Sequence, residues 1–252
     1  MAGDSLFSYI ETLQGDRPWG RVLDAGLGDH SLNWIRSLTT DGWTGVTVDD
    51  FRMLNLVPKI EKTMRDADSL VLGDWRDENL LEGEQFDVVL VDYLIGAIDA
   101  FTPYFQNDIL KRLHRHVRGC MYLVGLTPFP DKAEKTAHQK IIELARLKDA
   151  LRLLTGKRAY REYPLEWVMK RLDEAGFEVT AHQIFPIVMR RRYFERQLRS
   201  CRQLVKDLND TLMAEVFRQH IQQLESDLFA LSGLSNGIHF GSDYVIAATP
   251  KK

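Results

Sequence analysis

The sequence predicts an α/β fold in which a mostly parallel, seven-stranded sheet lies between two layers of helices. Short apolar segments of strand length alternate with segments of helical periodicity, which is the pattern of a parallel sheet with helical crossovers. The run Phe86–Val91 is apolar except for Asp87, as expected of a strand covered on both faces. With 252 residues and 44% apolar side chains, the chain has material for one large core. We therefore expect a single domain over residues 1–252.

Local signals predict the individual elements. Strand segments are short and apolar and are bounded by turn residues, whereas helix segments carry apolar residues three and four apart and end at Gly. We predict strands over residues 21–25, 46–48, 70–72, 86–91, 121–126, 177–185 and 244–248. We predict helices over residues 6–13, 31–38, 53–64 with an interruption at Pro58, 102–117 opened by Thr102 and Pro103, 133–155 closed by Gly156, and 164–175 closed by Gly176.

A helical insertion over residues 187–236 separates the sixth and seventh predicted strands. Residues 191–231 follow one helical pattern without Gly or Pro, but a single helix of that length would run ~60 Å, so we expect a break at residues 208–211, where Asn209 or Asp210 can cap a new helix. The first half of this hairpin is basic and the second acidic, so antiparallel packing would pair opposite charges. The insertion is predicted to form a lid or a dimer element.

Composition and charge exclude several classes of protein. The formal net charge of −3 gives no general attraction to nucleic acid, which we therefore consider an unlikely partner. The two cysteines indicate neither a disulfide framework nor a zinc site, and we expect no metal. The first residues lack the pattern of a signal peptide and no apolar run is long enough to span a membrane, so we expect a cytoplasmic protein without a membrane partner.

A glycine-containing turn follows the first predicted strand. Asp24 ends this strand, and Gly26 and Gly28 lie in the turn behind it. Glycine allows a ligand to approach the backbone closely, so a cofactor is predicted to lie over the turn. Because many α/β folds use glycine in tight strand-to-helix connections, the turn alone does not establish a ligand site.

Acidic residues also end the next three predicted strands. Asp49 and Asp50 follow the second strand, where a carboxylate can accept both hydroxyls of a ribose. Asp74 and Trp75 follow the third, giving an acceptor for an exocyclic amine and an aromatic face for adenine. Asp92 follows the fourth. Ligands of open parallel sheets bind outside the carboxyl ends of the strands, so four acids in register there predict nucleoside recognition.

These motifs together resemble the class I S-adenosylmethionine-dependent methyltransferases, which have a three-layer, Rossmann-like fold. Asp24-Ala25-Gly26-Leu27-Gly28 resembles the first motif of the family, Asp49-Asp50 its acidic ribose position, Gly73-Asp74-Trp75 its adenine motif, and the segment Phe86 to Tyr93 its fourth-strand motif. The similarity spans residues 20–186 and the last strand, which the resemblance makes antiparallel.

The resemblance implies a role for each motif. It places Gly26 and Gly28 near the methionine part of S-adenosylmethionine, Asp49 or Asp50 at the ribose, and Asp74 with Trp75 at the adenine. Which of the two adjacent acids binds the ribose stays open. The family often has a third glycine where this chain has His30.

The resemblance also implies methyl transfer to a small-molecule acceptor through a nitrogen or oxygen nucleophile. The leaving thioether needs no proton, so positioning can suffice. The candidate catalytic residues are Asp92, which could contact the methionine amino group or a substrate amine, Tyr93, which could orient the nucleophile, and His30, which titrates near neutrality.

Two alternatives remain open at this stage. Gly28-Asp29 and Asp92 also resemble the spermidine synthase type of aminopropyltransferase, which uses decarboxylated S-adenosylmethionine. Only about twenty residues precede the first predicted strand, however, where those enzymes usually carry a β-domain. The other alternative is a non-catalytic partner subunit on the same fold. A hydride-transfer enzyme is disfavoured: a glycine turn with an acid after the second strand also suits NAD, but the last glycine of that motif is missing. The sequence does not identify the acceptor or the oligomeric state, although a homodimer through the insertion is one expectation.

Overall fold

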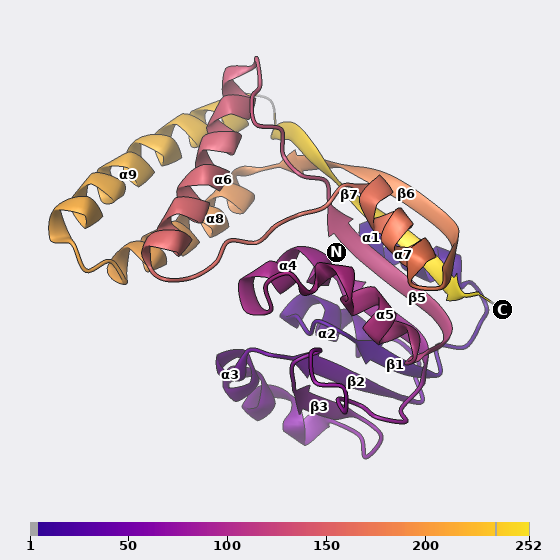
Figure 1. Ribbon diagram of the computed structural model, residues 1–252. Coiled ribbons are helices and arrows are strands. Elements are labelled where there is room, and N and C mark those ends of the chain that lie inside the picture. Colours follow the sequence, from indigo (N-terminus) through magenta and orange to yellow (C-terminus); the bar gives the residue numbers. More distant parts are fainter. Residues whose placement is uncertain (1–4, 235, 252) are drawn as a thin grey trace. The chain divides into compact units, whose positions relative to one another are not determined.

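The computed structural model describes residues 5–234 and 236–251, which form two compact units (Figure 1). The sheet unit comprises Met1–Thr127, Arg161–Phe185 and Asp243–Lys252. The helical unit comprises Pro128–Tyr160 and Pro186–Ser242. Each unit has its own core of buried apolar side chains.

One seven-stranded sheet, with the strand order β3-β2-β1-β4-β5-β7-β6, runs through the fold. Its strands are β1 (Arg21–Asp24), β2 (Gly42–Thr47), β3 (Ser69–Leu72), β4 (Phe86–Asp92), β5 (Val117–Leu126), β6 (Phe177–Met189) and β7 (Ile238–Pro250). Strands β1 to β5 pair in parallel, and β7 runs antiparallel to β5, with Met121 opposite Ala248. The predicted fold class, including the antiparallel last strand, is confirmed, although β7 begins six residues earlier than residue 244.

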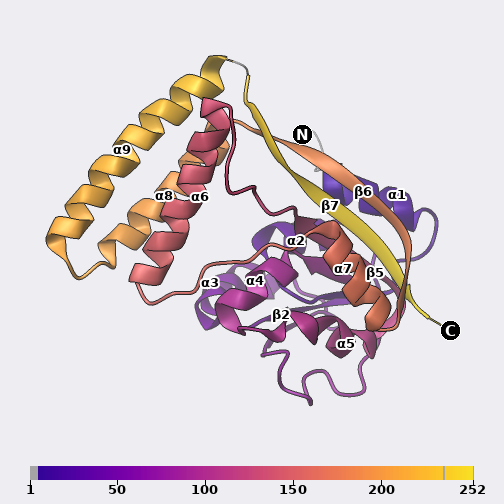
Figure 2. The ribbon, with the colours of Figure 1, turned by 45° about the horizontal axis from the view of Figure 1, so that its top comes forward.

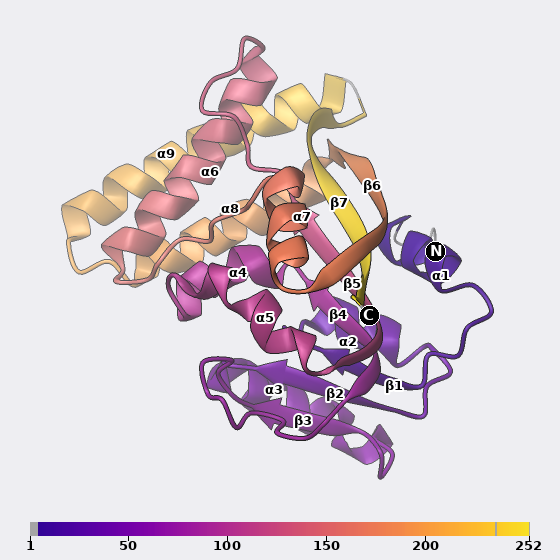
Figure 3. The same cartoon turned by 45° about the vertical axis from the view of Figure 1, so that its right-hand side comes forward.

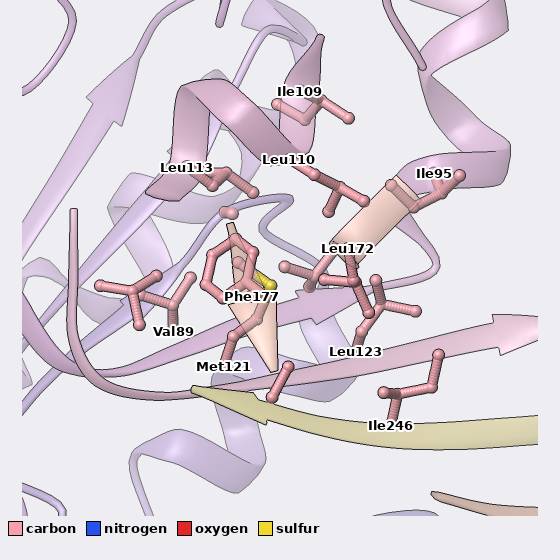
Figure 4. Close-up of a cluster of buried hydrophobic side chains, with 14 of the residues drawn as sticks. Val89, Ile95, Ile109, Leu110, Leu113, Met121, Leu123, Leu172, Phe177 and Ile246 are labelled. Atoms are coloured by element: carbon pink, nitrogen blue, oxygen red, sulfur yellow. The ribbon is translucent and has the colours of Figure 1, made fainter. Parts of the chain in front are cut away.

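Helices cover both faces of the sheet in the sheet unit (Figure 3). On one face, α1 (Ser5–Gln14), α2 (Asp29–Ile35) and α3 (Asp50–Ile60) bury Ile10, Leu32 and Leu56 against the sheet. On the other face, α4 (Leu94–Phe101), α5 (Ile109–His114) and α7 (Leu165–Glu174) bury Ile95, Leu110 and Leu172 among the strand side chains shown in Figure 4. The alternation along each strand explains the two cores, because successive residues point to opposite faces.

The helix predicted over residues 102–117 is wrong. Helix α4 begins directly after β4 and ends at Phe101, and a 3₁₀ turn over Phe105–Asn107 then leads into the short helix α5. Pro103 explains the break: the residue before a proline is disfavoured in the α region, and Thr102 has φ −134° and ψ 71°. The predicted opening of a helix is in fact the end of one.

The helix predicted over residues 53–64 begins earlier than predicted and is not interrupted at its proline. Helix α3 runs from Asp50 to Ile60 without a break at Pro58, and a 3₁₀ turn over Glu61–Thr63 follows it. Pro58 removes one helical hydrogen bond near the carboxyl end of α3. The carbonyl of Leu54 loses this partner, and Leu54 lies at an exposed position where water can replace it.

In the described part of the helical unit, the helices α6 (Thr136–Leu154), α8 (Arg191–Lys206) and α9 (Thr211–Leu234) lie side by side (Figure 2). The predicted break at residues 208–211 is confirmed, and Asp210 caps α9 by accepting a 2.9 Å hydrogen bond from the Met213 amide. The sequence placed only residues 187–236 in the insertion. Helix α6 joins them because its apolar side chains, Ile141 and Leu151 among them, share one core with α8 and α9. The lid or dimer role of residues 187–236 stays a prediction.

Candidate functional site

The glycine turn after β1 is tied to both neighbouring strands. The amide of Ala25 donates to the Leu90 carbonyl at 2.9 Å, and the amide of Leu27 donates to the Val46 carbonyl at 2.8 Å. A Cβ atom on Gly26 would lie 3.0 Å from a methyl group of Leu94, the first residue of α4. A side chain at position 26 would therefore require Leu94 to shift at the ends of β1 and β4, so the packing favours glycine whether or not a ligand is bound.

Asp24 ends β1 with a carboxyl group that is almost completely buried. Its Oδ2 accepts a 2.6 Å hydrogen bond from the Ser31 hydroxyl, and its Oδ1 accepts a 3.3 Å bond from the Gly26 amide. Burial nevertheless raises the pKa of Asp24 to about 6, because desolvation of the charged form outweighs these hydrogen bonds. Asp24 therefore stabilises the turn through its bonds to Gly26 and Ser31, and its pKa of about 6 lies close to neutral pH.

Gly28 has a more open environment than Gly26. Its amide donates to the Ser31 hydroxyl at 3.1 Å, and its φ of −120° is one that any residue can adopt. The nearest atoms to a Cβ built on Gly28 are the Ser31 hydroxyl at 3.4 Å and the Arg52 guanidinium at 3.6 Å, both ordinary contact distances. Neither the backbone nor the packing of the described residues therefore demands glycine at position 28.

Asp49 and Asp50 begin α3, immediately beyond β2. Oδ1 of Asp49 accepts a 3.0 Å hydrogen bond from the Arg52 amide and so caps the helix. Asp49 is half-buried, and its second oxygen has no partner among residues 5–234 and 236–251. Asp50 is exposed, and its carboxylate accepts a hydrogen bond from the adjacent Phe51 amide at 2.7 Å.

Arg52 joins the glycine turn to the acid at the end of β2, and the sequence analysis missed it. Its guanidinium donates to the carbonyl of Leu27 at 2.9 Å, while its amide is bound by Asp49. The signal in the sequence was a basic residue at the third position of a helix that an aspartate caps. Arg52 thereby brings together two motifs that lie more than twenty residues apart in the chain.

Asp74 and Trp75 follow β3; the role of Asp74 stays a prediction, whereas Trp75 differs from its predicted role. The Asp74 carboxylate is held by Arg76, whose Nη2 donates at 2.6 Å. Burial raises the pKa of Asp74, but the hydrogen bonds from Arg76 outweigh this effect and leave the pKa below its usual value. Trp75 is 6% exposed, and its Nε1 donates to the Ala25 carbonyl at 2.7 Å. The indole of Trp75 therefore supports the glycine turn from within the core and does not offer the predicted aromatic face.

The three predicted catalytic residues lie on different elements. Asp92 is the last residue of β4, and Tyr93 follows it in the left-handed region with φ 50°. A non-glycine residue in this region costs about 1–3 kcal/mol and turns the chain sharply into α4. His30 is exposed in the first turn of α2, where its ring stacks on Phe7 with the centroids 4.9 Å apart. The structure places Asp92 and Tyr93 at the carboxyl edge of the sheet, next to the Leu94 that packs on Gly26.

Exposed apolar side chains accompany the acids at this edge, which the sequence analysis did not anticipate. Val48 follows β2 and is 40% exposed, and Leu72 ends β3 and is 53% exposed. Thr47 pairs with Leu72 in the sheet, so Val48 and Leu72 belong to neighbouring strand ends. Apolar surface beside a carboxylate fits a nucleoside, whose base is flat and weakly polar and whose ribose carries hydroxyl donors. The residues present therefore fit the nucleoside part of S-adenosylmethionine.

Comparison with known proteins places the fold. No protein-family model matches the sequence, and no curated protein matches it. Among solved structures, a proposed methyltransferase from Bacillus halodurans is 15% identical, with 99% of this chain and 100% of the other covered and a TM-score of 0.62. A proposed sarcosine dimethylglycine methyltransferase from Galdieria sulphuraria is 9% identical, with 98% and 84% covered and a TM-score of 0.57. A mycolic acid cyclopropane synthase in complex with S-adenosylhomocysteine is 15% identical, with 96% and 83% covered and a TM-score of 0.54.

At these identities the likeness concerns the course of the backbone. The strand order and the antiparallel β7 are shared features of an architecture, whereas the pocket chemistry depends on side chains that are mostly different. The chain has the fold of the class I S-adenosylmethionine-dependent methyltransferases.

Proposed function

We propose that this protein is an S-adenosylmethionine-dependent methyltransferase that modifies a nitrogen or oxygen atom of a small molecule. One observation carries the proposal furthest: on a methyltransferase fold, Arg52 bonds both to the glycine turn and to the aspartate at the end of β2. Arg52 thus holds the glycine turn, which a ligand can approach closely, next to Asp49, whose second carboxylate oxygen has no partner among the described residues. The solved structures with a similar fold carry names that point to different substrates, so the identity of the acceptor here is a proposal.

Asp49 is our choice for the ribose acceptor. Its position is fixed by the capping bond to the Arg52 amide, and the second carboxylate oxygen is available to a ligand hydroxyl. Asp50 is more exposed and is bonded within its own turn. Val48 and Leu72 would contact the adenine in place of Trp75, and Gly28 would admit the methionine part over the turn.

S-adenosylmethionine, when bound, supplies an electrophilic methyl group on a sulfonium, so the protein does not need to protonate a leaving group. The remaining task of the chain is to hold the acceptor in line and to accommodate the proton that its nucleophile loses. Asp92 and Tyr93 lie at the end of β4, a strand that is hydrogen-bonded to the turn, and are proposed to orient the acceptor. His30, which is exposed in the first turn of α2 just after the glycine turn, is proposed to act as the proton acceptor.

A product assay tests this function. The protein is incubated with methyl-labelled S-adenosylmethionine and a panel of small amines, carboxylates, phenols and thiols, and label in the acceptor is measured by mass spectrometry. We expect label in an amine or a hydroxyl compound and S-adenosylhomocysteine as the second product. Aminopropyl transfer from the decarboxylated cofactor to a diamine would favour the spermidine synthase type instead, and cofactor binding with no transfer would favour a partner subunit.

A further inference from the structure

A row of basic side chains follows one exposed side of α8 in the helical unit. Arg196 lies four positions after Arg192, Arg199 three positions after Arg196, and Lys206 seven positions after Arg199. At this spacing all four residues fall on one side of the helix. These four side chains, called here the basic row, are exposed, whereas Phe194 and the apolar residues of the opposite side are buried in the bundle core. Helix α8 presents them along a nearly straight line of about 20 Å.

The acids of the bundle do not neutralise the basic row. Five acids of the bundle pair with cations outside the row, in the ion pairs Arg191–Glu195, Arg202–Glu225, Lys157–Asp207, Lys140–Asp227 and Arg218–Glu215. Within the described part of the chain, the three arginines of the row form no ion pair, and the Lys206 amine donates to Gln203. The expected pairing of opposite charges between the halves of the hairpin is therefore limited to Arg202–Glu225 among the described residues.

Exposed apolar side chains lie at the end of the bundle to which the basic row leads. Leu212 and Val216, in the first turns of α9, are 75% and 59% exposed, and Leu153 and Leu154, at the end of α6, are 58% and 50% exposed. The turn over residues 207–210 connects the last residue of α8 to α9, and the ion pair between Lys157 and Asp207 joins the segment after α6 to the same turn. Figures 1 and 2 both show the end of α6 and the beginning of α9 at one end of the bundle.

We propose that the helical unit binds an anionic lipid surface through the basic row, with Leu212 and Val216 inserting at the interface. Unpaired arginines attract anionic headgroups, and exposed leucine and valine side chains gain free energy when they leave water for the acyl boundary. Nucleic acid would use the arginines but not the apolar end, and the aromatic ring nearest to the row, Tyr193, is half-buried and already in contact with the Arg196 guanidinium, 5.8 Å from its centroid. The apolar end therefore decides between the two polyanions in favour of lipid.

This proposal concerns a bilayer surface and is independent of the proposed methyl transfer. No helix in residues 5–234 and 236–251 has both the length and the apolar character needed to cross a membrane. The expectation of no membrane partner rested on that kind of segment and on the missing signal peptide. A peripheral contact needs neither, because charge and a few inserted side chains can supply the binding.

Vesicle sedimentation tests the proposal on the full chain. The probes are phosphatidylcholine vesicles with and without about one third phosphatidylserine, each at low and at high salt. We expect binding to the anionic vesicles at low salt, weak binding to the neutral ones, and release by salt. The triple variant Arg192→Gln, Arg196→Gln, Arg199→Gln should bind the anionic vesicles about a hundredfold more weakly, since each basic residue near the surface contributes about one factor of five.

A matched control removes three charges elsewhere. The variant Lys59→Gln, Lys62→Gln, Lys111→Gln has the same net charge as the arginine variant, and all three lysines are exposed in the sheet unit. It should keep most of the binding. A third variant, Leu212→Ser with Val216→Ser, should bind several-fold more weakly at every salt concentration, and circular dichroism checks that all variants are folded.

Three results would overturn the proposal. The first is binding to anionic vesicles that the arginine variant and the lysine variant weaken equally, because that pattern reports net charge alone. The second is the absence of binding to anionic vesicles by a folded wild-type chain at low salt. The third is tighter binding of a short RNA or DNA, lost in the arginine variant and kept in the Leu212 and Val216 variant, which would assign the row to nucleic acid.

Discussion

The hydroxyl of Ser31 donates a 2.6 Å hydrogen bond to the buried carboxyl group of Asp24. This bond joins the first turn of α2 to the end of β1 underneath the glycine turn. Burial raises the pKa of Asp24 by more than the bond from Ser31 lowers it, so the pKa is about 6. The support of the proposed cofactor site thus contains a group that changes charge within the physiological range.

Substitution of Asp24 by Asn should change how stability depends on pH. The pKa of Asp24 rises from 3.8 to about 6 on folding, so the folded state holds the proton more tightly than the unfolded state. This stabilising contribution is complete below about pH 4 and is lost as the pH rises through 6, in total roughly 3 kcal/mol. Urea unfolding of both proteins between pH 4 and pH 8 measures the difference. Wild type should lose stability relative to Asp24→Asn over this range, and a constant difference would contradict the raised pKa.

Gly28→Ala should weaken cofactor binding without harming the fold. A methyl group at position 28 meets only the Ser31 hydroxyl and the Arg52 guanidinium, at ordinary contact distances, and the backbone is unstrained for alanine. Thermal stability should be equal to that of wild type or slightly higher. The affinity for S-adenosylhomocysteine, measured by calorimetry, should fall at least tenfold. Unchanged affinity would place the cofactor away from this turn.

Gly26→Ala serves as the contrasting variant. Its methyl group would lie 3.0 Å from Leu94, so the ends of β1 and β4 must shift to admit it. We expect the free energy of unfolding to fall by the roughly 1–3 kcal/mol typical of overpacking, which lowers the melting temperature. Cofactor binding should also become weaker. A fully stable Gly26→Ala protein would show that Leu94 moves freely.

Two substitutions of Asp49 separate its capping role from its proposed ligand role. Asn retains a side-chain oxygen that can accept the bond from the Arg52 amide, so Asp49→Asn should unfold at nearly the wild-type temperature. Asp49→Ala also loses the cap and should be about 1 kcal/mol less stable. Both should bind S-adenosylhomocysteine much more weakly, because neither has the carboxylate. If Asp50→Asn is the variant that loses affinity and Asp49→Asn is not, the ribose assignment moves to Asp50.

The helix break in the helical unit gives a prediction about stability alone. Asp210 caps α9, whereas no capping bond from the Asn209 side chain is present among the described residues. Asp210→Ala should therefore lower the free energy of unfolding by about 1 kcal/mol, and Asn209→Ala should have little effect. Chemical denaturation of the two variants checks this, and equal effects would contradict the assignment of the cap.

The parts of the fold that could be predicted are those where one signal dominates. Strand β4 is buried on both faces, so its apolar run identifies it, and Asp210 could be anticipated as a cap because a helix of forty residues would be too long. The start of α4 could not be anticipated, because it depends on Tyr93 adopting a left-handed conformation that its residue type disfavours. Pro103 was therefore assigned to the wrong end of a helix.

The site shows the same division. The glycines and acids could be placed at the strand ends from their spacing, since parallel strands share one edge. The orientation of Trp75 could not, because whether an indole faces a ligand or the core depends on tertiary packing, here on its bond to the Ala25 carbonyl. Arg52 was missed for a related reason: its partner Leu27 is adjacent only in the folded chain. The contribution of α6 to the helical unit likewise follows from packing and not from sequence order.

Calorimetric titration with four ligands tests the central claim most directly. The wild-type protein is titrated in parallel with S-adenosylmethionine, S-adenosylhomocysteine, decarboxylated S-adenosylmethionine and NAD, and Gly28→Ala and Asp49→Asn are titrated beside it. The account predicts that the two ligands with a methionine carboxylate bind wild type most tightly and that both variants weaken them. Preference for the decarboxylated form or for NAD, or no binding of any of the four, would contradict the proposed methyltransferase function.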